Sequence, residues 1–299
     1  MKQTEKGFLL LTSQLGNPER KPLTVAQFRT LAKRVSQVET PVCDRDLTVF
    51  DVMALGYSEE FSRRIVSLLE EEQLLEYYLH SAKKQECTVI TRVSETYPQC
   101  IRKKLGLDAP GSLWCKGDPS ILQMPCVSLV GSREIREENR LFSAEVGRQA
   151  ALQGYALVSG NARGADRIAQ EACLEMGGYV ISIVADELET KITQSHVLYV
   201  SENGFDLAFT AARALSRNHL IHSLSPKTFV AQCQWKSGGT WDGSVKNLQN
   251  GWSDVYCYAD GSPAASELVD MGATFVSVEE LSDIGGLKPN FPNFLHADG

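Results

Sequence analysis

The chain has 299 residues, of which 43% are hydrophobic and 22% charged, so it can bury the core of one large or two moderate domains. Its net charge of −7 is uneven: residues 1–125 carry 17 basic and 16 acidic side chains, whereas residues 126–299 carry 13 and 21. The acidic second part argues against a broad basic face for duplex DNA, although it permits a local basic groove.

Targeting and metal signals are missing from the sequence. No stretch is apolar for long enough to span a bilayer, and the N-terminus lacks a small-residue cleavage pattern, so we expect neither a membrane span nor export. The eight cysteines form no Cys-x-x-Cys pair and have no histidine at zinc-ligand spacing. We therefore expect a reduced, cytoplasmic protein without a metal or another cofactor.

The first part of the chain, residues 1–80, is predicted to be a small helical domain. Thr24 can cap a helix that runs through Val35 with apolar residues at helical spacing, and Ser58 can cap another over residues 59–69. Small helical units often bind partners, but this one has no marked basic stripe.

Alternating strands and helices follow. Cys87–Val93 and Leu113–Lys116 are predicted strands at the edge of the main sheet. From Cys126 onwards, strands are predicted at residues 126–130, 155–159, 179–184, 197–201, 227–232 and 254–259, with helices between them. This order predicts an α/β protein whose residues 81–285 form an extended Rossmann-like domain, with a doubly wound, mainly parallel sheet. Residues 286–299 are predicted to be an irregular tail.

Two glycine turns stand where predicted strands end. Gly131-Ser132-Arg133 follows the run 126–130, and Ser159-Gly160 leads through Arg163-Gly164 to Asp166 at the start of a helix. Neither turn has the G-x-G-x-x-G spacing, and the chain has no P-loop. Such turns expose free amides at helix N-termini, so they predict a phosphate-bearing ligand at this edge of the sheet.

Further turns are expected at the same edge. Ser201-Glu202 follows the fourth parallel strand, and Lys236-Ser237-Gly238-Gly239-Thr240 follows the fifth, with Thr240 as the predicted helix cap. Arg217-Asn218 interrupts or ends a helix. Asp166 is predicted to cap its helix or to order the neighbouring loop, and we expect His219 and His222 to pack rather than to bind a metal.

In this order the motifs resemble the DNA-processing protein A (DprA/Smf) family. The resemblance rests on Tyr97-Pro98, Leu113 to Asp118, Gly131-Ser132-Arg133, Ser159 to Asp166, Ser201-Glu202, Arg217-Asn218, Ser237 to Thr240 and Gly272-Ala273. It covers about residues 55–275. The resemblance implies an extended Rossmann fold that binds single-stranded DNA and commonly dimerises. It also implies a role in DNA uptake, natural transformation or recombination, with a RecA-type recombinase as an expected partner.

The resemblance implies a DNA-binding or phosphate-binding site without catalytic residues. Its DNA contacts would be Gly131, Ser132, Arg133, Ser159, Gly160, Arg163, Gly164, Arg217, Asn218, Lys236, Ser237 and Gly238. Asp166, Glu202 and Thr240 would support the site. Trp235 and Trp241 could stack on bases, although core packing is the favoured interpretation for Trp235.

Some positions depart from the family pattern. The histidine of the family's D-x-x-A-H is Gln170 here, the last arginine of its R-N-R is His219, and a proline-glycine turn is replaced by Ala259-Asp260-Gly261. We also expect a member without the C-terminal winged helix. These changes indicate a divergent member. One alternative is a nucleotide-binding or nucleotide-cleaving protein, similar to LOG-like phosphoribohydrolases, or a nucleotide sensor in stress or phage defence. Another is a structural protein that binds a partner through residues 1–80.

Overall fold

The computed structural model describes residues 1–38 and 47–290 of the chain. Its described part contains one sheet, in which β1 and β2 are antiparallel to their neighbours and the remaining strands are parallel. The strands are β1 (Cys87–Thr91), β2 (Ser112–Lys116), β3 (Cys126–Val130), β4 (Ala156–Ser159), β5 (Tyr179–Ile183), β6 (Val197–Glu202), β7 (Lys227–Val230), β8 (Asp254–Tyr258) and β9 (Thr274–Val276). The predicted strands are confirmed, with shifts of one or two residues at their ends.

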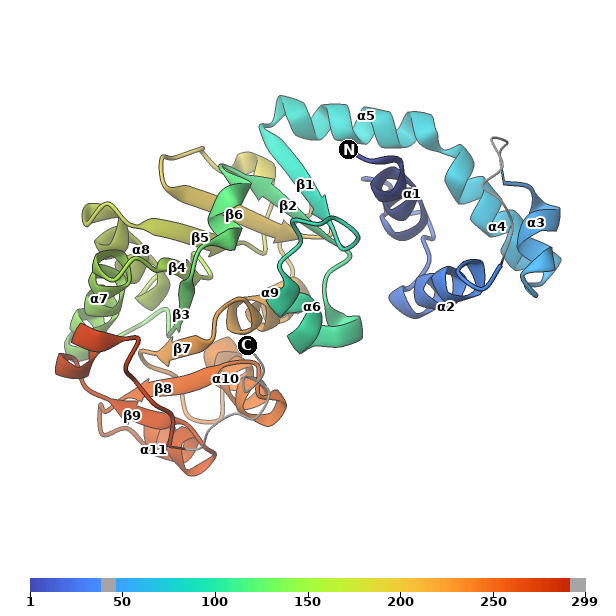
Figure 1. Cartoon of the computed structure of the whole chain (residues 1–299). Coiled ribbons are helices and arrows are strands. Elements are labelled where there is room, and N and C mark those ends of the chain that lie inside the picture. The colour runs from blue at the N-terminus through green and yellow to red at the C-terminus, as the bar shows by residue number, and fades with distance from the viewer. Residues whose placement is uncertain (39–46, 291–299) are drawn as a thin grey trace.

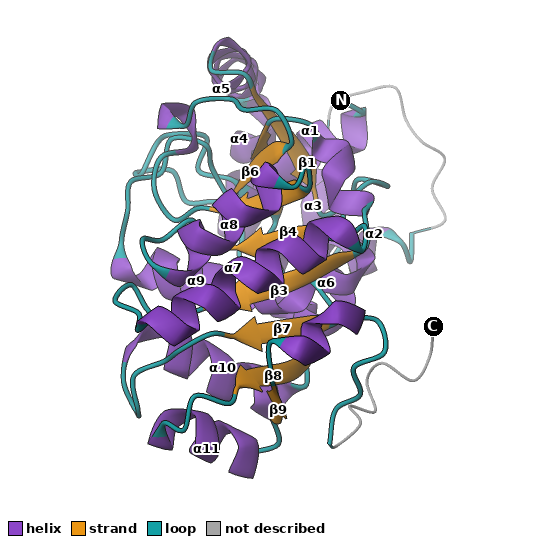
Figure 2. Ribbon diagram, turned by 90° about the vertical axis from the view of Figure 1, so that its left-hand side faces the viewer, coloured by secondary structure: helices purple, strands orange, loops and turns teal. Residues whose placement is uncertain are grey.

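The strand order is β1-β2-β6-β5-β4-β3-β7-β8-β9. From β3 the chain builds outward through β4, β5 and β6, then returns to the other side of β3 with β7 and continues to β9. Figure 2 shows the arrows of β4, β3, β7 and β8 pointing the same way. The sheet is therefore doubly wound and Rossmann-like, and its direction of winding reverses between β3 and β7.

Helices cover both faces of the sheet, because strands buried on both faces present apolar side chains to each. One face packs on α7 (Glu137–Leu152) and α8 (Ala165–Glu175). The other packs on α6 (Gln99–Leu105), α9 (Ala211–Leu224), α10 (Gly238–Asn250) and α11 (Pro263–Asp270). The helix α6 lies where the sequence analysis noted only a short basic segment.

The N-terminal helices lie beyond the β1 edge of the sheet (Figure 1). They are α1 (Gln3–Thr12), α2 (Val25–Val35), α3 (Val49–Ala54), α4 (Glu59–Glu70) and α5 (Glu72–Lys84). Thr24 and Ser58 cap α2 and α4 as predicted, since their hydroxyls accept the N–H groups of Gln27 and Phe61. The helix α5 runs through the expected boundary at residue 80, so the division into domains stays a prediction.

The N-terminal helices contribute to two hydrophobic clusters, one of their own and one shared with the sheet. Leu31, Val52 and Ile65 belong to a cluster of their own, whereas Tyr78 of α5 packs with Trp114 and Phe205 of the sheet region. The ring centroids of Tyr78 and Trp114 lie 5.2 Å apart, and the Tyr78 hydroxyl donates a hydrogen bond to Asp206 at 2.6 Å.

Beyond Asp283 the chain is irregular as far as it is described. Lys227 fastens this segment to the sheet, because its Nζ donates to the carbonyls of Ile284 and Leu287 at 2.7 and 2.6 Å. The rest of the predicted tail, residues 291–299, lies outside the described residues. Within the described part of the chain, no helix combines the length and the apolarity that crossing a membrane requires.

Candidate nucleic-acid interface

The reversal point between β3 and β7 brings together two turns that lie about a hundred residues apart in the sequence. The Ala231 amide donates to the Val130 carbonyl at 3.0 Å, so the pairing of the strands continues to their ends. One residue later, the amide and hydroxyl of Ser132 both donate to the Gln232 carbonyl, at 2.9 and 3.2 Å. The Gly-Ser-Arg turn is therefore attached to both halves of the sheet, at the place where open α/β sheets bind ligands.

The two predicted glycine turns lie in direct contact. Gly164 has φ +88°, and a Cβ there would lie 2.5 Å from the Arg133 carbonyl oxygen. A Cβ at Gly131 would overlap the Ala165 methyl group. Because the Ala165 amide also donates to the Ser132 carbonyl at 3.2 Å, the turns form one rigid unit that presents Arg133 and Arg163.

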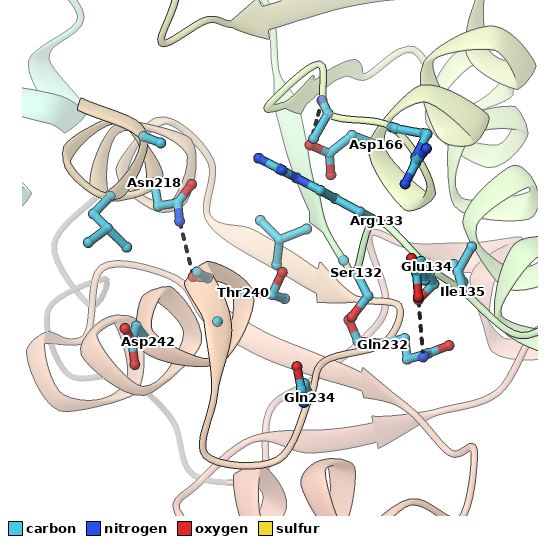
Figure 3. A pocket seen from close by; sticks show the side chains of 18 of the residues that line it. Ser132, Arg133, Glu134, Ile135, Asp166, Asn218, Gln232, Gln234, Thr240 and Asp242 are labelled. Carbon is cyan, nitrogen blue, oxygen red and sulfur yellow. Dashed lines mark hydrogen bonds between the residues drawn. The ribbon is translucent and has the colours of Figure 1, made fainter. Parts of the chain in front are cut away.

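A pocket of about 1180 Å³ opens at this point (Figure 3). Arg133 extends across it towards Asp166 and Asn218. Most of the predicted site residues line it: Gly131, Ser132, Arg133, Arg163, Asp166, Arg217, Asn218, Ser237, Gly238 and Thr240. The expectation that these separate motifs converge at one edge of the sheet is therefore met by the geometry of the pocket.

Other predicted residues do not reach the pocket lining. Ser159 is buried, and its hydroxyl accepts Gln170 Nε2 at 2.5 Å. Glu202 is also buried and accepts the Ser216 hydroxyl at 2.9 Å, so it fixes α9, and burial raises the pKa of its carboxyl. Lys236 turns outward and pairs with Glu267 at 3.1 Å.

Gly160 and Gly164 are not among the lining residues either, because they lie within the packed turns. Gly160 has a particular task, since a Cβ there would lie 2.6 Å from Nη2 of Arg217 and would overlap Nη1. The missing side chain leaves room for the guanidinium of Arg217 to lie flat against the turn.

The guanidinium of Arg217 is anchored to the end of strand β5. Its Nη1 donates to the Ile183 carbonyl at 3.2 Å at the end of β5, while its Nε is buried without a partner among the described residues. Burial lowers the pKa of Arg217, and the nearby Asp166 partly opposes this shift. A half-buried guanidinium with unused N–H donors at the edge of a pocket is well suited to bind an anion.

Arg133 and Arg163 add two more positive charges to the pocket beside that of Arg217. Both side chains are exposed, and neither makes an ion pair with another described residue. Arg136, which the sequence analysis did not single out, also lines the pocket but is paired with Asp260 at 2.5 Å and with Glu138 at 3.2 Å. The pocket therefore offers two exposed guanidinium groups without an ion-pair partner among the described residues, beside the half-buried one of Arg217.

Asp166 organises the second turn, as predicted. Its Oδ2 accepts the amides of Gly160 at 3.1 Å and Ala162 at 3.2 Å, which fixes the loop that carries Arg163. Burial is the largest influence on its pKa and raises it to about 6, although Arg217 and both amides act in the opposite direction. The carboxyl is therefore partly protonated only slightly below neutral pH.

The N-terminus of α10 forms the opposite wall. The helix begins at Gly238 and its N-cap is Ser237, so the prediction that Thr240 is the cap is wrong: Thr240 lies within the first turn. Ser237 makes no side-chain cap hydrogen bond with a described residue, which leaves the amides of this turn open to the pocket. Asn218 connects α9 to this turn, because its Nδ2 donates to the Gly239 carbonyl at 3.0 Å.

The two predicted stacking residues, Trp235 and Trp241, differ in exposure. Trp241 is 7% exposed and packs into the core, whereas Trp235 is 53% exposed, so core packing was the wrong interpretation for Trp235. The side chain of Trp235 is held by a hydrogen bond from Nε1 to Glu267 and by Lys236 Nζ, which lies 4.8 Å above its ring centroid. A short β-bridge between Gln234 and Ser237 turns it outward.

Sequence reasoning also missed pocket residues without a motif. Gln232 falls within a predicted strand, but β7 ends at Val230, and the Gln232 side chain accepts the Arg136 amide at 2.9 Å. Phe209, which is 55% exposed, enters the lining from the loop before α9. Its exposure could not be deduced from the sequence, because a single phenylalanine in a loop gives no periodic signal.

His219 and His222 are packed between neighbouring side chains. His222 is buried and its Nδ1 lies 3.1 Å from Asn247 Nδ2, and burial lowers its pKa to about 3. His219 packs against Trp252, with 4.8 Å between ring centroids. Within residues 1–38 and 47–290 there is no group of three or more His, Cys, Asp and Glu side chains placed to hold a metal ion.

Comparison with known proteins assigns the chain to a family. The model of the DNA recombination-mediator protein A family matches residues 88–282. The protein Smf of Escherichia coli K12 is 28% identical over 156 residues, which cover 48% of this chain and 41% of Smf. The DNA processing protein DprA of Streptococcus pneumoniae is 30% identical over 141 residues, covering 44% and 50%. The matches span about half the length of these curated relatives.

Solved structures agree in fold. The X-ray structure of DNA processing protein A from Streptococcus pneumoniae aligns with a TM-score of 0.72 at 22% identity, over 96% of this chain and 99% of that one. A structure of DNA processing protein A from Helicobacter pylori, whose single-stranded DNA binding mode it describes, aligns with a TM-score of 0.56 at 22% identity, over 66% and 94%. With the family model matching most of the sheet and its helices, the chain belongs to the DNA recombination-mediator protein A family.

Proposed function

We propose that the pocket between β3 and β7 binds the phosphodiester backbone of single-stranded DNA, without catalysing a reaction, in DNA uptake, transformation or recombination. The observation that carries the proposal is the pair of exposed, unpaired arginines, Arg133 and Arg163, on the rigid double turn. A single strand needs a groove that follows its phosphates and does not require each base to be recognised. Family membership and the Helicobacter pylori relative support the same ligand.

The local charge explains how an acidic chain can hold a polyanion. Arg133, Arg163 and Arg217 meet in the pocket with the carboxyls of Glu134, Asp166 and Asp242. The arginines are concentrated at the two glycine turns, while Asp242 belongs to α10 on the opposite wall. The pocket can therefore be attractive to phosphate at one wall although the net charge of the chain is −7.

Fluorescence anisotropy of labelled poly-dT of about 20 nucleotides tests the proposal. Affinity should fall steeply between about 50 and 200 mM salt, and duplex DNA should bind more weakly. Arg133→Ala and Arg163→Ala should each weaken binding about tenfold, as expected for a lost charge-assisted hydrogen bond. Arg148→Ala is the matched control, because Arg148 pairs with Glu145 on α7 and does not line the pocket.

The result that would reject the proposal is equal affinity of both pocket variants and the control. Because Arg133 and Arg163 are exposed, their removal should leave the melting temperature unchanged, and circular dichroism verifies that a loss of affinity is not a loss of fold.

A nucleotide ligand is the second candidate. Ser237-Gly238-Gly239-Thr240 does line the pocket together with Asp242, as a phosphate-binding turn of a nucleotide site would. Release of free base from a nucleoside monophosphate, lost in Asp242→Asn, would support cleavage. If no base is released from any common nucleotide, the enzymatic candidate fails.

We further propose a homodimer and a contact with a RecA-type recombinase in the cytoplasm, on the strength of the family alone. Light scattering during size-exclusion chromatography measures the first. Stimulation of recombinase assembly on single-stranded DNA measures the second, and a monomer without stimulation would contradict both.

A further inference from the structure

We infer that the single strand continues from the pocket into a second basic cleft across the N-terminal ends of α7 and α8. This inference rests on the proposed function, because it concerns the same ligand. The second cleft has a volume of about 460 Å³ and shares Arg133, Glu134, Ile135 and Arg163 with the first, so the two form one continuous surface. Nothing in the shared sequence motifs requires this extension.

The second cleft adds two arginines of its own. Arg140 lies in the first turn of α7 and Arg167 in the first turn of α8, and both are exposed. Arg140 pairs with Glu137 at 3.3 Å, whereas Arg167 makes no ion pair with a described residue. Together with Arg133 and Arg163, they place four guanidinium groups along a path that leaves the pocket.

The chemistry of the lining suits a nucleic-acid strand rather than a compact anion. The arginines stand at the edges, and Ile135 and Ile168 provide apolar surface between them. A strand presents charged phosphates and flat apolar bases alternately, so such a mixed surface can contact both. Glu134 and Glu171 are the acidic members of the lining, and their repulsion limits the path to the side of the arginines.

The packing of α7 on α8 keeps the path fixed. Gly147 of α7 has no side chain, and a Cβ there would lie 2.9 Å from the carbonyl carbon of Ala169 on α8. This close approach holds the two helices, and therefore Arg140 and Arg167, in one arrangement. A preorganised row of cations binds a polyanion without the entropic cost of ordering the helices.

Two lengths of poly-dT, of about 6 and about 20 nucleotides, distinguish the extension from the central pocket. The double variant Arg140→Ala/Arg167→Ala should bind the short oligonucleotide as the wild type does, within about twofold. It should bind the long one about tenfold more weakly, and the slope of log affinity against log salt should decrease by about 1.4, for two phosphate contacts. Arg148→Ala is again the control, since it removes the same kind of ion-paired arginine from α7.

A second variant tests the cleft through a gain of affinity, which a loss of fold could not produce. Glu171→Gln removes an exposed carboxylate from the cleft, so it should raise affinity for the long oligonucleotide only. Equal affinity of the double variant and Arg148→Ala for the long oligonucleotide would overturn the inference, as would equal weakening for both lengths. If the wild type binds neither length, the proposed function fails instead.

Discussion

Replacing Asp166 by asparagine should stabilise the protein near neutral pH, although it removes a carboxylate that holds a loop. The Asp166 side chain is 5% exposed, and its Oδ2 accepts the amides of Gly160 and Ala162. An asparagine oxygen in the same place can still accept both amides, whereas the cost of burying a charge disappears. The variant therefore separates the structural task of this residue from its charge.

The magnitude follows from the pKa of Asp166. Its rise from the ordinary 3.8 to about 6 means that folding favours the protonated carboxyl, so the group destabilises the native state as pH rises through this range. The shift corresponds to about 3 kcal/mol above pH 6 and to about 0.5 kcal/mol near pH 4. The pKa of about 6 already includes the hydrogen bonds from the two amides, so asparagine should raise the free energy of unfolding by about 2–3 kcal/mol near pH 7.5.

Urea unfolding of wild type and Asp166→Asn near pH 4 and pH 7.5 measures the gain. The gain should be largest at the higher pH and fall to about 0.5 kcal/mol near pH 4. A gain of the same size at both values, or a loss near pH 7.5, would refute the role of the buried charge. Affinity for single-stranded DNA should rise as well, and Asp242→Asn, which removes an exposed carboxylate from the same pocket, shows how much of that rise comes from charge alone.

Other variants test the contacts around the pocket. Gly160→Ala should displace the guanidinium of Arg217, since its Cβ would lie 2.6 Å from Nη2, and anisotropy should show weaker DNA binding; unchanged affinity would contradict a role for Arg217 in binding. Gly147→Ala should cost about 1–3 kcal/mol in urea unfolding, because its Cβ would meet the backbone of α8; an unchanged midpoint would contradict this packing. Glu267→Gln should free Lys236 and steepen the salt dependence of DNA binding, and an unchanged slope would leave Lys236 outside the interface.

The parts of the fold that depend on local patterns were predictable. The apolar run at residues 126–130 is β3 to the residue, and Thr24 and Ser58 cap helices because short polar side chains before an apolar stripe can satisfy first-turn amides. Glycine turns after strands predicted the edge at which the pocket lies, since a parallel sheet brings the carboxyl ends of its strands to one side.

The details of the site depend on contacts between distant segments. No local pattern pairs Ser132 with Gln232, because the reversal of strand order that joins them is a property of the whole sheet. Trp235 looked like a core residue, yet the tight turn from Gln234 to Ser237 directs it outward. Thr240 resembles a cap in sequence, but the N-cap of α10 is Ser237, three residues earlier.

The course of α5 through the expected boundary has a consequence for how the protein unfolds. Tyr78 packs with Trp114 and Phe205 and bonds Asp206, while Leu68 of the preceding helix belongs to the N-terminal cluster. The helical segment therefore contributes side chains both to the core of the sheet region and to the N-terminal cluster. Cleavage between residues 80 and 85 would leave aromatic surface uncovered on both pieces, so we expect the N-terminal helices and the β1 edge to melt in one cooperative transition.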